Sequence, residues 1–132
     1  MADELIFIDT NILMELLFRR SNYDLAMNGI ISLQANCTVC ASIVSLATVL
    51  YFVESQGFDK KIAHNFMKGY KILDMNNDDY MWAEANDQGD FEDALQTACA
   101  KRYKCSYILT LDKKFVKMYG KFFPVHAITQ GS

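Results

Sequence analysis

The side chains best suited to chemistry in this chain of 132 residues are four aspartates. Asp9 and Asp112 each come directly after an apolar run that is typical of a buried strand. Asp90 and Asp93 stand three residues apart at the expected start of a helix, where carboxylates face the positive end of the helix dipole. Residues at this spacing share one face of a helix, so the two carboxylates can act together.

These four carboxylates predict a binding site for a divalent cation. If the two strands lie side by side and parallel, their carboxyl ends bring all four side chains towards one crevice, the usual ligand position in an open α/β sheet. Clustered carboxylates repel one another, and a hard divalent cation is their natural partner. Asp9 could instead be only the N-cap of the helix that follows it, because aspartate often has that role.

The elements that must position these residues alternate between strands and helices. Strands are expected at 5–8, 38–41, 71–74, 106–111 and 124–128. Helices are expected at about 10–19, 22–34, 43–55, 59–70, 91–103 and 113–119, with one more that starts at 76 or 77. This alternation predicts right-handed crossovers and a three-layer α/β/α sandwich with a central parallel sheet.

Length and composition indicate one globular domain over residues 1–132. Hydrophobic residues make up 52% of the chain and charged residues 22%, which argues against disorder. No apolar run approaches the roughly 18–20 residues that a membrane span needs. The first four residues include two acidic residues, Asp3 and Glu4, and no basic one, whereas a signal peptide would begin with basic residues. We therefore expect a cytoplasmic protein with no membrane partner.

The cysteines offer a second, weaker candidate for a metal site. Cys37 and Cys40 have the spacing of metal ligands, but Cys99 and Cys105 do not. Buried reduced thiols are the preferred interpretation. The two histidines have no acidic or hydroxyl partner nearby in the sequence, so we expect them to be surface or packing residues.

Charge is distributed unevenly, although the net charge is only −3. Residues 74–93 include eight acidic residues and no basic one, whereas residues 101–121 include seven basic residues and one acidic residue. The imbalance could reflect two solvated faces of opposite sign. It could equally be a carboxylate site beside a Lys/Arg patch that holds a phosphate backbone.

The helix expected at 43–55 is apolar around much of its circumference. Such a helix is buried either in the domain or in a dimer. The apolar helices together exceed what one small sheet can cover, so a homodimer is expected.

Three blocks of sequence together resemble the PIN domain, the fold of VapC-type toxins and related metal-dependent ribonucleases. They cover residues 6–13, 90–95 and 108–115, and their order and separation match a single PIN-like nuclease domain over essentially the whole chain. The resemblance implies a Rossmann-like parallel sheet and an acidic pocket that binds Mg²⁺ or Mn²⁺. It also implies hydrolysis of phosphodiester bonds in RNA. If the toxin analogy holds, a small antitoxin would lay apolar and cationic side chains over the pocket.

Carried over residue by residue, Asp9, Asp93 and Asp112 match the acidic positions of the family. Thr110 matches its pocket hydroxyl. Asp90, three residues before Asp93, is a further candidate carboxylate.

One departure from the family pattern lies in the third helix. The family usually places a glutamate there, three residues after a Ser or Thr, whereas here Ser45 is followed by Thr48. Glu54 is six residues beyond Thr48 and is therefore rotated by about 240° around the helix. Asp90 is the candidate that restores the missing charge.

The resulting hypothesis is metal-assisted hydrolysis of single-stranded RNA. Asp9, Asp93 and Asp112 would hold one or two cations, with Asp90 bound directly or through water. The expected substrate-binding residues are Thr10, Asn11, Thr48, Thr110, Lys113 and Lys114, with Lys117, Lys101 or Arg102 as further phosphate contacts. The lysines could also serve solubility alone.

Two other functions stay open at this point. The loss of a carboxylate at Thr48 would suit a catalytically weakened module that binds metal or RNA. A phosphoryl-transfer site, as in receiver or haloacid-dehalogenase-like folds, would need a second acid two residues after Asp9, or a lysine that follows a strand where a phospho-aspartate requires one. The chain has neither.

Overall fold

Five parallel strands form the centre of the computed structural model, which describes residues 4–128. They are β1 (Glu4–Ile8), β2 (Cys37–Ser42), β3 (Lys71–Leu73), β4 (Tyr107–Thr110) and β5 (Val125–Ala127), in the order β3-β2-β1-β4-β5. From β1 the chain adds β2 and β3 on one side of the sheet and then β4 and β5 on the other, so the direction of winding changes between β1 and β4. The predicted Rossmann-like parallel sheet is confirmed. Residues 1–3, which include the acidic Asp3 of the signal-peptide argument, lie outside the described range.

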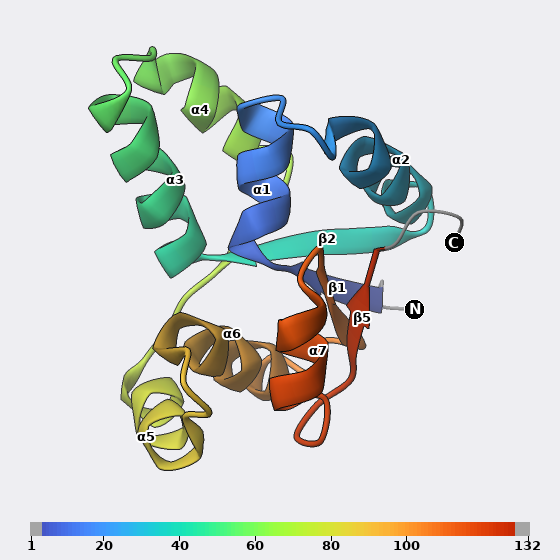
Figure 1. Ribbon diagram of the computed structural model, residues 1–132, viewed down its shortest axis with the longest axis vertical. Coiled ribbons are helices and arrows are strands. Elements are labelled where there is room, and N and C mark those ends of the chain that lie inside the picture. The colour runs from blue at the N-terminus through green and yellow to red at the C-terminus, as the bar shows by residue number, and fades with distance from the viewer. Residues whose placement is uncertain (1–3, 129–132) are drawn as a thin grey trace.

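Helices cover both faces of this sheet. They are α1 (Thr10–Leu17), α2 (Tyr23–Gln34), α3 (Ile43–Ser55), α4 (Lys60–Met67), α5 (Asn77–Asn86), α6 (Phe91–Arg102) and α7 (Lys113–Tyr119). Figure 1 shows α1 to α4 on one side of the sheet and α5 to α7 on the other. The predicted three-layer α/β/α sandwich is therefore confirmed.

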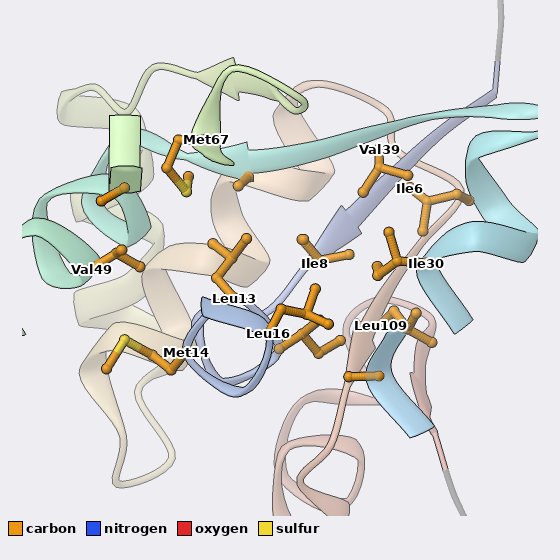
Figure 2. Packing of buried hydrophobic residues seen from close by; sticks show 14 of the residues in the cluster. Ile6, Ile8, Leu13, Met14, Leu16, Ile30, Val39, Val49, Met67 and Leu109 are labelled. Atoms are coloured by element: carbon orange, nitrogen blue, oxygen red, sulfur yellow. The ribbon is translucent and has the colours of Figure 1, made fainter. Parts of the chain in front are cut away.

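Alternate residues of each strand point into two separate cores. Ile6 and Ile8 of β1 pack with α1 to α4, and Figure 2 shows Ile8 beside Leu13 of α1 and Ile6 near Val39 and Ile30. Phe7, between Ile6 and Ile8 in β1, packs with α5 to α7. These three side chains of β1 are fully buried. A strand buried on both faces reads as a continuous apolar run, which is why the strands are visible in the sequence.

Several helices begin at the caps that the sequence predicts. The Ser42 hydroxyl accepts a hydrogen bond from the Ser45 amide at 3.0 Å, and Asp59 caps α4. Asn76 and Asp79 form a capping box at the start of α5. Gly57 follows α3 with φ of +75°, a left-handed conformation that glycine adopts at little cost.

The apolar helix α3 is less buried than a helix inside a domain. Val49 and Val53 are buried, but Ile43 is 44% exposed and Tyr51 is 66% exposed. Of the two alternatives, burial in the domain therefore does not hold for the outer face, because only one side of α3 packs on α1, α4 and the sheet. Homodimer formation stays a prediction.

An ion pair with one buried partner joins α5 to α6. Arg102 donates two hydrogen bonds to opposite oxygens of Asp79, Nε to Oδ1 at 3.0 Å and Nη2 to Oδ2 at 2.9 Å. Asp79 is only 2% exposed. Arg102 also donates to the Asp74 carbonyl at 2.7 Å. Arg102, considered above as a phosphate contact, therefore has a structural role. Part of the charge imbalance is neutralised within the fold.

No helix between residues 4 and 128 combines the length and the apolar character needed to cross a membrane.

Candidate active site

Asp9 lies at the carboxyl end of β1 and is held there by two side chains. Its oxygens accept hydrogen bonds from the Thr110 hydroxyl at 2.7 Å and from the Gln96 amide at 3.0 Å. The side chain makes no capping hydrogen bond to α1. Asp9 is therefore not the simple N-cap that the sequence left open, because its carboxylate is directed by residues of β4 and α6.

Thr110 positions the neighbouring groups of the site from a buried location. Its hydroxyl donates to Asp9 and accepts the Asp112 amide at 3.0 Å. The Asn11 side chain donates to the same hydroxyl at 3.4 Å. This arrangement joins the ends of β1 and β4, where the strand order reverses, and keeps Asp9 close to Asp112.

Asp90 and Asp112 each cap a helix that opens at the site. Asp90 accepts the Asp93 amide at 3.1 Å, and Asp112 accepts the Lys114 amide at 2.8 Å. The loop before α6 is held by Tyr119, whose hydroxyl donates to the Asp90 carbonyl at 2.8 Å. These contacts fix the backbone that presents Asp90 and Asp93.

A polar pocket of about 300 Å³ gathers these residues. It is lined by Asp9, Thr10, Asn11, Met14, Arg20, Thr48, Phe52, Asp90, Glu92, Asp93 and Asp112. All four predicted carboxylates are in this set, together with Thr10, Asn11 and Thr48. Thr110 is fully buried behind the pocket, and Lys113 and Lys114 are exposed residues outside its lining.

The surroundings of Asp9 and Asp93 disfavour the ionised forms of these two carboxylates. Burial raises the pKa of Asp9, and the hydrogen bonds from Thr110 and Gln96 oppose that rise. The pKa of Asp93 is raised to about 8, first by burial and then by repulsion from Asp9 and three other carboxylates around the pocket. A cation in the pocket would relieve this repulsion.

The donor chemistry of the pocket fits a hard divalent cation, since carboxylate and hydroxyl oxygens are the ligands that Mg²⁺ and Mn²⁺ prefer. In the part of the chain that the structure describes, however, no three Asp, Glu, His or Cys side chains converge closely enough to hold an ion together.

Four residues of the site were not identified as site residues from the sequence. Gln96 and Ser45 are fully buried polar residues, Glu92 is half-buried in the pocket wall, and Arg20 reaches the pocket from beyond α1. Gln96 had a sequence signal, because it stands three residues after Asp93 on the same face of α6. Arg20 had none, since it follows the end of α1.

The third helix contributes no carboxylate to the pocket. Thr48 and Phe52 are its lining residues. Glu54 faces away and lies 3.8 Å from Lys60. This agrees with the rotation expected from its position on the helix.

A larger groove lies beside the acidic pocket. Its volume is about 510 Å³, and most of its lining is apolar. The lining residues are Leu17, Phe18, Arg19, Arg20, Val53, Gln56, Phe58, Asp59, Ile62 and Ala63. Arg20 belongs to both surfaces, so the groove and the pocket adjoin.

Comparison with known proteins gives a consistent family and fold. A sequence model of the PIN domain matches residues 5–114. No curated protein matches the chain in sequence.

Solved structures share the fold at low sequence identity. The chain matches a toxin-antitoxin complex from Klebsiella pneumoniae with a TM-score of 0.72 and 18% identity, covering 94% of this chain and 98% of the other. VapBC2 from Rickettsia felis, bound to a DNA fragment from its promoter, gives 0.74 and 16%, covering 95% and 99%. VapC20 from Mycobacterium tuberculosis, a sarcin-ricin loop cleaving toxin, gives 0.67 and 17%, covering 89% and 95%.

Proposed function

The chain belongs to the PIN domain family, and from this premise we propose that it is a metal-dependent ribonuclease that hydrolyses phosphodiester bonds of single-stranded RNA. We further propose that it is the toxin of a toxin–antitoxin pair acting in the cytoplasm. The observation that carries the proposal is the pocket where β1 and β4 end. Five carboxylates line it, and two of them, Asp9 and Asp93, have raised pKa values.

Asp9, Asp93 and Asp112 would hold the cation, with Asp90 bound directly or through water. A bound Mg²⁺ or Mn²⁺ would supply Lewis-acid activation of water and would neutralise charge on the scissile phosphate. Thr110 and Gln96 each donate a hydrogen bond to one of the two Asp9 carboxylate oxygens, and this fixes the orientation of the carboxylate. Hydrogen-bond donors that hold a metal ligand in this way orient it and raise its affinity for the metal.

Polar and basic side chains around the pocket would bind the RNA. Thr10, Asn11 and Thr48 line the pocket, and Arg20 is its basic lining residue. Lys113 and Lys114 are exposed immediately after Asp112, where they would hold flanking phosphates. Contacts of this kind make RNA affinity fall as salt rises.

Two exposed apolar surfaces are suited to binding protein partners. The groove beside the pocket would take an apolar segment of an antitoxin, whose cationic side chains would reach the acidic pocket. The outer face of α3, with Ile43 and Tyr51 exposed, would form a homodimer. Exposed apolar area of this kind on a small domain is typical of interfaces.

The direct test is cleavage of labelled single-stranded RNA by the purified protein in Mn²⁺. We expect cleavage by the parent and its loss in Asp9→Asn and Asp93→Asn, with circular dichroism showing that both variants remain folded. Glu84→Gln, an exposed change on α5 outside the pocket, is the matched control. Equal cleavage by parent and variants would contradict the proposal. RNA binding without turnover in the parent would favour the weakened binding module.

A further inference from the structure

A chain of hydroxyl groups runs from β2 through α3 and α1 to Glu92 on α6. The Ser42 hydroxyl donates to the Ser45 hydroxyl at 3.1 Å. The Ser45 and Thr10 hydroxyl oxygens lie 2.7 Å apart, and Thr10 donates to Glu92 at 2.9 Å. The Ser42–Ser45 and Ser45–Thr10 contacts are buried, whereas the Thr10–Glu92 contact is partly buried at the wall of the pocket.

The donor in each of these hydrogen bonds can be assigned by starting from Glu92. Thr10 has a single hydroxyl proton, which it donates to Glu92 at 2.9 Å because the other acceptor, the Gln96 side-chain carbonyl, is farther away at 3.5 Å. Ser45 must then donate to Thr10, and Ser42 must donate to Ser45. Hydrogen bonds aligned in this way strengthen one another. The arrangement holds the Glu92 carboxylate in one place.

That place is the side of the pocket where α3 supplies no acid. Glu92 shares the lining with Thr48 and Phe52 of α3. Its charge contributes to the raised pKa of both Asp9 and Asp93, so it lies within electrostatic range of both predicted metal ligands. Unlike Asp90 and Asp112, Glu92 does not serve as a helix cap.

We propose that Glu92 is a cation-binding residue that supplies, directly or through one water, the carboxylate that α3 lacks at Thr48. This inference rests on the proposed function, because it concerns the same cation. It assigns the compensating charge to Glu92 of α6, which the hydroxyl chain holds ready, and so differs from the expectation that Asp90 restores it.

The test is Mn²⁺ binding measured by calorimetry on Glu92→Gln. Glutamine has the same shape and can still accept from Thr10, so the change removes the charge and keeps the hydrogen bond. We expect Mn²⁺ affinity to fall by about tenfold to a hundredfold. The titration is repeated at high salt, where long-range charge effects are screened and the loss from a ligand persists. Glu84→Gln, outside the pocket, is expected to bind like the parent.

A second variant tests the location of the charge. Adding Thr48→Glu to Glu92→Gln places a carboxylate on α3, and we expect it to restore most of the affinity. Thermal unfolding without metal should be unchanged or raised in Glu92→Gln, because one source of repulsion is gone; a purely structural role would lower it.

Three results would overturn the inference. They are an unchanged affinity in Glu92→Gln, a loss that disappears at high salt, and a double variant as weak as Glu92→Gln alone. Failure of the parent itself to bind Mn²⁺ would remove the proposed function as well, so the two failures are distinguishable.

Discussion

The carboxylates near the two ends of α6 have opposite surroundings. Near its carboxyl end, Arg102 binds Asp79 of α5 through two hydrogen bonds, and Asp79 is almost fully buried. At its amino end, Asp93 is surrounded by other carboxylates, and its pKa is raised to about 8. Arg20 lines the same pocket, yet it makes no ion pair within 4.0 Å among residues 4–128.

The Arg102–Asp79 pair stabilises the fold, whereas the cluster of carboxylates around Asp93 lowers the stability of the folded state. A buried carboxylate is normally paired, because an uncompensated buried charge costs several kcal/mol. The chain satisfies this rule at Asp79, whereas Asp93, which is partly buried, has no cationic partner within 4.0 Å among residues 4–128. Departures of this kind concentrate at functional sites, where an external charge completes the arrangement.

Breaking the paired end should have the largest effect. Arg102→Met leaves Asp79 buried without its partner, and we expect the free energy of unfolding to fall by about 3–5 kcal/mol. Urea denaturation measures this change. The double variant Arg102→Met with Asp79→Leu should recover part of the loss, since it removes the buried charge but also the capping hydrogen bond from the Asn76 amide. A loss of less than about 1 kcal/mol in the single variant would show that the two ends do not differ as described.

Supplying a cation to the unpaired end should have the next largest effect. A ligand that binds only the folded state stabilises it by about 2.7 kcal/mol at a concentration of 100 times its Kd. We therefore expect saturating Mn²⁺ to raise the thermal unfolding midpoint of the parent and EDTA to reverse the rise. The double variant Asp9→Asn with Asp93→Asn should not respond, whereas Arg102→Met should still respond. An equal rise in the double variant would place the ion elsewhere.

Much of the fold was readable from the sequence because its signals are local. The start of α3 follows from the Ser42 cap, and its end follows from Gly57 with its positive φ. Helix α1 ends two residues before the predicted boundary at 19, because Arg19 adopts a left-handed conformation with φ of +48°. Arginine carries no sequence signal for that conformation, so the boundary could not be predicted.

The acidic residues of the site were also predictable, because each follows a strand or opens a helix. The residues that direct them were not. Gln96 reaches Asp9 across 87 positions of sequence, and the hydroxyl chain from Ser42 to Glu92 crosses four elements. Such contacts depend on how helices are rotated against the sheet, which the hydrophobic pattern specifies only coarsely.

Removing the charge of Asp93 should have the smallest effect and an unusual dependence on pH. The unfolded aspartate has a pKa of about 3.9, whereas the folded one is raised to about 8. Between these values the folded state holds the proton more tightly than the unfolded state. The stability from this group is therefore fully present below about pH 4 and is lost as the pH rises towards 8.

Asp93→Asn removes the ionisation, so the metal-free variant should be more stable than the metal-free parent above pH 8 and the gap should narrow as the pH falls. Because Asp93 is only partly buried, screening by solvent limits the gain to on the order of 1–2 kcal/mol. Urea denaturation in EDTA at pH 5 and pH 8.5 measures it. A variant less stable than the parent at pH 8.5 would mean that the Asp93 carboxylate contributes to folding, as Asp79 does, and the contrast between the two ends of α6 would be lost.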